Sequence, residues 1–417
     1  FHLTADGALS LSPMSNDSDL KFSVAGPSLR RIGEMFDSGL LVDKSFDVSG
    51  EVAGTPTGFR MRNFMAHVGE NDVRGEFTAD LRDKPRVTAS LSSDLLDLRE
   101  RLKTLVESDE EQDDVADDSS GLLFSDEPID TSALQAADID AGLQVGRLIT
   151  NTLDVTEFRV ELRLQDGELR VDPISMNEGT GSLAGKFSLI PDAKGYALDM
   201  LLEADGLHLG LAPSEDQQLS ALPAMSGKVE LHGTGASMHQ IMAAANGGIS
   251  VRQGAGEVKE FIAAVLFRDV VLEALRTINP LRKKETRKTL DCGIYEIGIV
   301  DGLATLEQVA MQTDQLLVVV TGTINLDTEQ LDLNFRAKPR EGVGVSLGTL
   351  ANSFLGVRGT LASPKVSLDA KSSVTATGAA VATGGLSLLA RGLFDRLSAE
   401  KDICKQKPEP GEDDASE

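Results

Sequence analysis

A glycine-flanked serine near the end of the chain is the first group that could do covalent chemistry. Gly344, Ser346 and Gly348 spell G-x-S-x-G, the pattern of the nucleophile elbow, in which a strand-to-helix turn exposes a reactive serine. The elbow needs an acidic residue and then a histidine as later partners, and no histidine follows Ser346. We therefore interpret this stretch as a flexible glycine loop and expect that the chain is not an enzyme.

Three other patterns are too incomplete to predict a ligand site. Residues 178–186, EGTGSLAGK, have the wrong spacing for a phosphate loop, and Phe187 stands where Ser or Thr is required. The acidic run 107–118 lacks the glycine and the spacing of a calcium loop. The five histidines, at positions 2, 67, 208, 232 and 239, do not cluster at metal-ligand spacing. We expect solvated or hydrogen-bonded imidazoles, no metal and no cofactor.

Charge and composition narrow the class of protein. The formal net charge is -26, from 40 basic and 66 acidic residues, which argues against nucleic acid as a partner. Residues 107–130 hold eleven acidic and no basic residues, and the last ten residues add five acids, so both runs are predicted to be solvated and disordered. With no Trp and 4% aromatic residues, the core must consist of aliphatic side chains.

The hydrophobic pattern has the period of a β-strand. In residues 158–164, apolar side chains alternate with charged ones, and residues 318–326 and 331–335 keep the same two-residue step. Turn signals recur at intervals of roughly ten residues, which is typical of an all-β array. Each strand therefore has one apolar face, and the chain is predicted to form antiparallel meanders with short connections.

Helical patterns are few. Residues 257–276 have apolar stripes on more than one side, which predicts a cover helix that is too short and too charged to span a membrane. Residues 28–35 predict a short helix, and a leucine stripe predicts a terminal amphipathic helix over 386–404. We expect six segments: a β region at 1–106, an acidic linker at 107–131, a second β region at 132–369, a low-complexity linker at 370–385, the terminal helix, and an acidic tail at 405–417.

The order of the strand motifs resembles a known family. Cys292, IYEIGIVDG, MQTD, GTINL, LDLNF, AKP and VRGTLASPKVSLD follow one another as in the C-terminal region of the AsmA family of bacterial envelope proteins. SFDVSGEVAGTPTGF near residue 45 and SGKVELHGTGASMHQ near residue 226 extend the resemblance over most of the chain. It implies a mostly β fold, an elongated antiparallel sheet curved into an apolar groove.

The resemblance also implies a function and a location. AsmA relatives are thought to carry lipid acyl chains, with phospholipid expected, between the inner and outer membranes. They usually begin with one inner-membrane helix. Because residues 3–11 already have a strand pattern, we expect this chain to be a fragment that is periplasmic and anchored by a helix upstream of Phe1. The resemblance allows envelope protein partners at the terminal helix.

Candidate site residues follow from the same resemblance. AsmA relatives often carry cysteines at both places where this chain has Cys292 and Cys404, and we therefore expect a disulfide. The residues expected to line the lipid groove are Phe158, Val160, Leu162, Leu164, Val318, Val320, Leu331, Leu333 and Phe335.

The alternating pattern alone does not choose between two architectures. A β-sandwich or β-solenoid scaffold would show the same alternation, because its apolar face would be covered by protein instead of lipid. The alternative function is accordingly a structural scaffold, without lipid, that assists outer-membrane protein assembly. The resemblance favours the groove.

Overall fold

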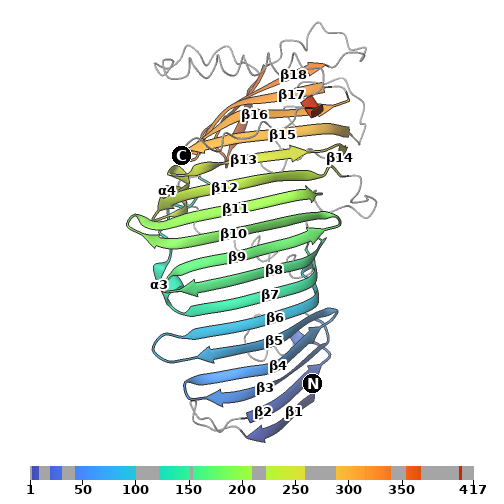
Figure 1. The fold of residues 1–417 in the computed structure, drawn as a ribbon, viewed down its shortest axis with the longest axis vertical. Coiled ribbons are helices and arrows are strands. Elements are labelled where there is room, and N and C mark those ends of the chain that lie inside the picture. The colour runs from blue at the N-terminus through green and yellow to red at the C-terminus, as the bar shows by residue number, and fades with distance from the viewer. Residues whose placement is uncertain are drawn as a thin grey trace, which may run out of the picture. The chain divides into compact units, whose positions relative to one another are not determined.

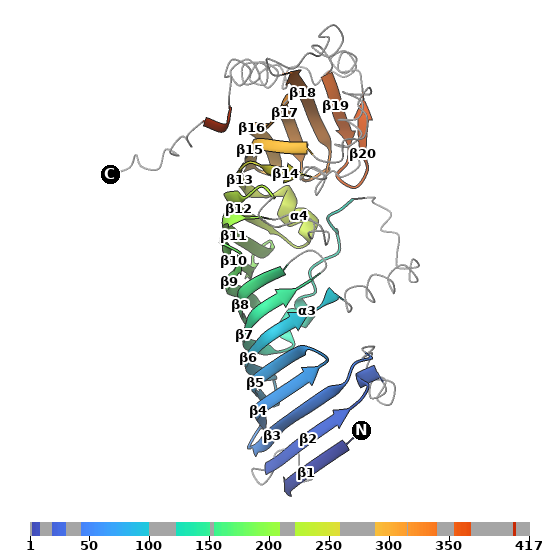
Figure 2. The same cartoon turned by 90° about the vertical axis from the view of Figure 1, so that its right-hand side faces the viewer.

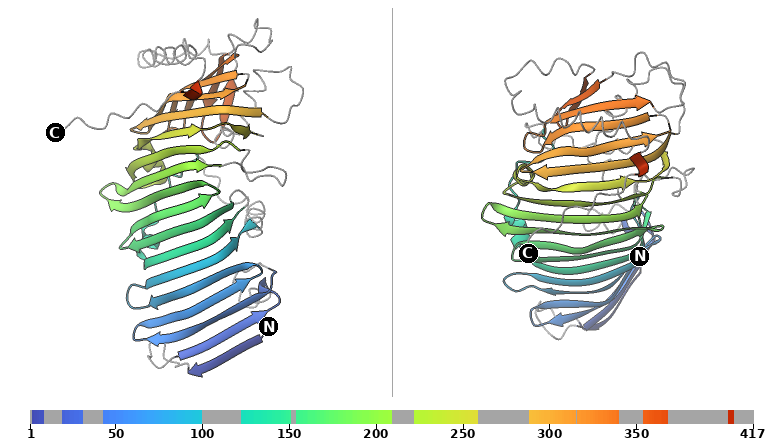
Figure 3. Two further views of the ribbon diagram at one scale, coloured as in Figure 1. Left: turned by 45° about the vertical axis from the view of Figure 1, so that its right-hand side comes forward. Right: turned by 45° about the horizontal axis from the view of Figure 1, so that its top comes forward.

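The structure is a computed structural model that divides into two compact units. It describes residues 2–8, 19–30, 43–99, 122–150, 154–208, 222–258, 288–314, 316–339, 354–367 and 403–405. Unit 1 comprises residues 1–216 and 228–244, and unit 2 comprises residues 217–227 and 245–417. The prediction of a mostly β, largely antiparallel fold is confirmed (Figures 1 and 3).

Unit 1 is built from long strands joined by short turns. Its strands are β1 (His2–Ala8), β2 (Asp19–Gly26), β3 (Phe46–Thr55), β4 (Gly58–Val68), β5 (Asn71–Asp80), β6 (Arg86–Asp97), β7 (Asp138–Ile149), β8 (Asp154–Gln165), β9 (Glu168–Glu178), β10 (Gly181–Asp192), β11 (Gly195–Leu207) and most of β12 (Met225–Gly235). The described residues of unit 1 also include two short helices, α3 (Thr131–Gln135) and α4 (Met238–Ala243).

One strand pair in unit 1 is parallel. β6 pairs with β7 from Arg86 opposite Asp138 to Asp97 opposite Ile149, whereas the other pairs from β1 to β11 are antiparallel. Parallel neighbours need a crossover that returns the chain to the end where the first strand began. Here the crossover consists of the 40 residues from 98 to 137, between the end of β6 and the start of β7, and it contains the acidic run.

Unit 2 is an antiparallel meander. Its strands are β13 (Asn246–Gln253), β14 (Gly256–Val258), β15 (Lys288–Val300), β16 (Leu303–Thr313), β17 (Leu316–Asn325), β18 (Leu331–Pro339), β19 (Phe354–Gly359) and β20 (Pro364–Ser367). β13 and β14 both pair with β15, and the remaining strands pair in sequence order. A single 3-10 turn, η2 (Ile403–Lys405), follows in the described part of the chain.

The acidic segment 107–131 connects two strands of one sheet, because β6 and β7 on either side of it pair directly. One expectation needs correction. The helix expected from residue 257 does not begin there, because Gly256–Val258 forms β14 against Lys288–Leu290.

The remaining helix and linker predictions lie mainly outside the described residues. These are the rest of 257–276, the low-complexity segment 370–385, the tail beyond residue 405, most of the helix expected at 28–35, and the terminal helix, of which residues 403–405 form η2. Within the described ranges, no helix has the length and apolar character needed to cross a membrane.

Candidate functional site

A continuous row of apolar side chains runs across unit 1. The register of the strands places ten of them opposite one another, one from each strand from β2 to β11. This middle row is Leu20, Val52, Met61, Phe77, Ala89, Ala141, Leu162, Val171, Phe187 and Met200. All except Met61 are only half-buried. The row is therefore an apolar surface that the fold leaves partly open.

Two further rows flank the middle row on the same face. One runs through Phe59, Ala79, Val87, Ile139, Leu164, Leu169, Leu189 and Leu198. The other runs through Leu91, Leu143, Val160 and Ile174. We call the three rows together the apolar face. Edge-to-face contacts of Phe77 with Phe59 and Phe64, at centroid distances of 6.1 and 6.2 Å, add aromatic packing at β4 and β5.

The opposite side of the same strands is charged. Arg159 pairs with Glu161 along β8, and Arg163 approaches Asp140 on β7 at 3.7 Å. Because successive side chains of a strand point to opposite faces, the charges are kept off the apolar face.

The expected groove residues fall into two different environments. Phe158, Val160 and Leu162 are half-buried on unit 1, and Leu164 beside them is 8% exposed. The unit 2 candidates belong to one hydrophobic cluster and are 2–6% exposed: Val318, Val320, Leu331, Leu333 and Phe335. Only the unit 1 candidates therefore lie on a surface that is partly open.

A chain segment covers part of the apolar face. We call residues 122–137, the described end of the β6–β7 crossover, the strap. Ile129 and Leu134 of the strap pack against a cluster formed by Leu189, Tyr196, Leu198 and Ile241. The sequence pattern did not predict this contact, although Ile129 near the end of the acidic run 107–130 and Leu134 just beyond it are apolar, which is a signal that the segment could return to the sheet.

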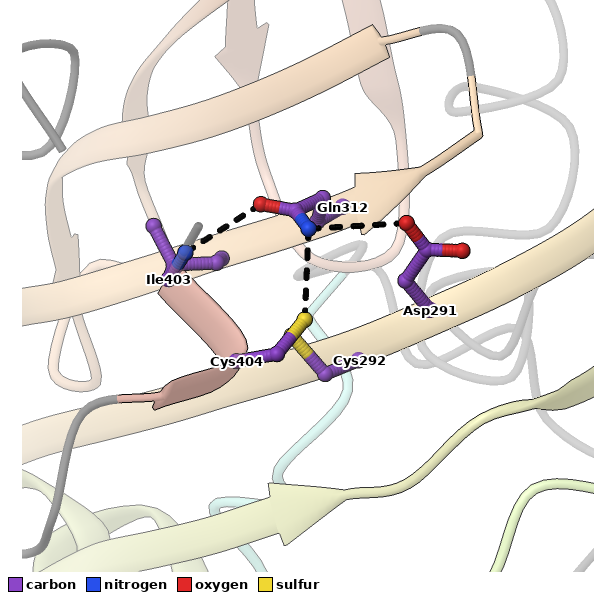
Figure 4. Close-up of a disulfide and its surroundings, with 5 residues drawn as sticks. All are labelled: Asp291, Cys292, Gln312, Ile403 and Cys404. Carbon is purple, nitrogen blue, oxygen red and sulfur yellow. Dashed lines mark hydrogen bonds between the residues drawn. A yellow bond between two sulfur atoms is a disulfide. The ribbon is translucent and has the colours of Figure 1, made fainter. Parts of the chain in front are cut away.

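The two cysteines both belong to unit 2. Cys292 on β15 and Cys404 in η2 are joined as a disulfide, with 2.07 Å between the sulfur atoms and 5.6 Å between the Cα atoms. Gln312 of β16 lies beside them and is 3% exposed. Its Nε2 donates to Cys404 Sγ at 3.3 Å and to Asp291 Oδ2 at 3.4 Å (Figure 4). Burial of Ile403 with Cys292 gives β15–β17 a second apolar cluster on their other face.

Two of the histidines contact carboxylates. His232 Nδ1 lies 2.6 Å from Asp199 Oδ1, and its Nε2 lies 3.2 Å from Glu230 Oε1, so Asp199 first and Glu230 second raise the pKa of His232. His239 contacts Asp126 at 2.6 Å. Across the described ranges, no three His, Cys, Asp or Glu side chains are placed to hold a metal. Ser346 lies outside these ranges, and Gly179 and Thr180 form the β9–β10 turn.

The chain is similar to a curated bacterial protein. AsmA family protein YhjG of Escherichia coli (strain K12) is 24% identical to it over 428 residues, which is 96% of this chain and 60% of that relative. The chain thus spans about 60% of the relative's length. No protein-family model and no solved structure matches it. The similarity over nearly the whole chain supports its membership of the AsmA family, whose strand motifs it resembles.

Proposed function

We propose that the apolar face of unit 1 binds and conducts the acyl chains of lipid, expected to be phospholipid, between the inner and outer membranes. The single observation that carries the proposal is the middle row, in which ten strands each supply an apolar side chain and nine of these remain half-buried. The AsmA family is envelope-associated, and such a surface would support outer-membrane biogenesis.

The energetics explain why such a surface is useful. Each methylene group that leaves a bilayer for water loses about 0.8 kcal/mol, so a phospholipid with roughly 30 methylenes faces on the order of 20 kcal/mol. An unbroken apolar row lets each methylene group of the acyl chain contact the next side chain as it leaves the previous one. A surface without converging polar anchors suits passage better than tight holding.

Two features support a periplasmic location. The disulfide of Cys292 and Cys404 belongs to an oxidising compartment, since cytosolic thiols are kept reduced. The family is associated with the envelope. We propose that the chain works in the periplasm, held to the inner membrane by a segment of the longer protein.

Photo-crosslinking in cells tests the proposal. A photoreactive residue replaces Val160, which is half-buried on the apolar face, and in a matched control it replaces Glu161, which is exposed on the opposite face. Lipid adducts are expected at position 160 and not at 161. Protein-only adducts or none at 160 would mean that protein covers this face, and the scaffold function would replace the lipid function.

A further inference from the structure

The crossover between β6 and β7 takes a longer route than the fold requires. The chain leaves β6 at Asp97, at one end of the strands, and must reach Asp138 at the other end. About a dozen residues suffice for a parallel connection. The 40-residue crossover instead reaches α4, which follows β12, before it returns through α3 to β7. In Figure 1 both helices lie at the same end of the unit 1 strands, and Figure 2 shows them on one side of the sheet.

The strap is anchored to α4 and its preceding turn by main-chain hydrogen bonds and by the contact of Asp126 with His239. The N–H of Ile129 donates to the carbonyl of Ala236 at 2.9 Å, and the N–H of His239 donates to the carbonyl of Ser125 at 3.1 Å. Pro128 and Ser237 form an isolated antiparallel bridge between these bonds. Together they make a two-stranded clasp that is separate from the ladder of the sheet.

The strap covers the sheet but is itself mostly exposed. No strap residue is fully buried, and α3 buries none of its five residues. Beneath it, however, Tyr196 is 2% exposed and Leu198 5% exposed. Phe187 and Met200 of the middle row also pack against this cluster. A mostly exposed segment thus occupies apolar surface that elsewhere in the same rows is half-open.

We propose that the strap is a movable cover that competes with lipid acyl chains for the apolar face at β9–β11. With the strap seated, its Ile129 and Leu134 take the place of an acyl chain on this part of the rows. When the clasp opens, the rows become accessible to acyl chains up to β11. This inference rests on the proposed function and adds a control point to it.

The middle row provides a matched pair of probe positions. Phe77 on β5 and Phe187 on β10 are the same residue type, lie in the same row and are both half-buried, but only Phe187 packs against the strap cluster. A photoreactive phenylalanine analogue at either position changes the side chain little. Lipid adducts at Phe77 report that lipid is present on unit 1, and adducts at Phe187 report access beneath the strap.

The clasp can be locked or loosened by substitution. Pro128 and Ser237 form the non-hydrogen-bonded pair of the bridge, where Cβ atoms approach most closely, so Pro128→Cys with Ser237→Cys is placed to form a disulfide. The single-cysteine variants, oxidised in the same way, are the controls. Ile129→Ser with Leu134→Ser removes the apolar contacts of the strap. Leu123→Ser, at a strap position that is 63% exposed, is its matched control.

Lipid crosslinking in cells with full-length protein distinguishes the outcomes. We expect adducts at Phe77 in every variant, a several-fold loss at Phe187 in the locked variant, and a several-fold gain at Phe187 in the loosened one. Adducts at Phe187 that do not change between locked and single-cysteine proteins, with Phe77 labelled, would overturn the strap inference and leave the proposed function intact. No lipid at Phe77 in any variant would overturn both. If the loosened variant does not fold, the comparison of the locked variant with the single-cysteine variants still tests the strap inference.

Discussion

The N–H of Ile403 donates to Oε1 of Gln312 at 3.2 Å, although the two residues are 91 positions apart. The amide of Gln312 is buried, and its Nε2 donates to the disulfide sulfur of Cys404 (Figure 4). Ile403 is 1% exposed and packs with Cys292, Leu317 and Val319. A covalent bond, a buried amide and an apolar side chain thus hold η2 against one face of β15–β17.

Removing this disulfide is expected to destabilise unit 2. Closing a loop across 112 residues constrains the unfolded chain, so Cys404→Ser should lower the free energy of unfolding by about 4 to 5 kcal/mol. The chain has no Trp and two tyrosines, Tyr196 in unit 1 and Tyr295 in unit 2. Urea unfolding followed by tyrosine fluorescence in a Tyr196→Phe background therefore reports on unit 2.

Two controls accompany the disulfide experiment. The double variant Cys292→Ser/Cys404→Ser should have the same free energy of unfolding as the single variant. Reductant should lower the free energy of unfolding of the original protein by the same amount. Alkylation, without reductant, of protein taken from an oxidising compartment should label neither cysteine. Two labelled cysteines would show that the bond does not form.

A glycine on β5 that has no room for a side chain provides a second test of the fold. Gly75 has a φ of +153°, and a Cβ there would lie 2.0 Å from the carbonyl oxygen of Ser90 on the neighbouring strand. Gly75→Ala should therefore lower the stability of unit 1 by on the order of 3 kcal/mol. Gly142→Ala is the matched control, because the nearest atom to its Cβ is Glu161 Cγ at 4.0 Å. Urea unfolding with Tyr196 as reporter, in a Tyr295→Phe background, measures the stability of unit 1. An equal loss of stability in both variants would contradict the register of β5 and β6.

The strand faces could be predicted from sequence because their signal is local. In β8, Val160 and Leu162 alternate with Glu161 and Arg163, and a period of two fixes which side chains share a face before any partner strand is known. The same rule could not separate open from closed surfaces. Val318 and Val160 have the same pattern, yet Val318 is 4% exposed in a packed cluster and Val160 is half-buried.

The parallel pairing and the strap could not be predicted in this way. No residue near Asp97 or Asp138 indicates that β6 and β7 are neighbours, because the pairing is set by a connection of 40 residues. The acidic composition of residues 107–130 predicts a solvated segment, and Ile129 and Leu134 near its end are too few to predict that the segment packs on the sheet.

Asp138 is expected to make stability sensitive to acid. Its carboxylate accepts hydrogen bonds from Lys84, from the N–H of Asp166 and from Arg86, and these hold its pKa below the ordinary value of 3.8. A lowered pKa in the folded state contributes stability above the unfolded pKa, and this stability is lost as the pH falls through the folded pKa.

Unfolding of unit 1 measured between neutral pH and about pH 3 tests this. Asp138→Asn should be less stable than the original protein at neutral pH, and the difference should shrink as the pH falls below the ordinary Asp range. Asp140→Asn, two residues along the same strand and exposed, is the control. A difference for Asp138→Asn that stays constant with pH would rule out the contribution of its charge.

A polar group in the middle row should interrupt the passage of acyl chains. Leu162 faces Ala141 and Val171 across its two neighbouring strands, so a chain that moves along the row has to contact it. Leu162→Gln places an amide there, and an apolar chain that covers this amide leaves it without a hydrogen-bond partner, at about 1 to 3 kcal/mol. Since 1.4 kcal/mol is about tenfold, the ratio of lipid crosslinking at Phe187 to that at Phe77, which lies on the other side of position 162, should change by about five-fold or more. Arg163→Gln introduces the same side chain on the charged face and should leave this ratio unchanged. An equal effect of both substitutions would mean that lipid does not follow the row.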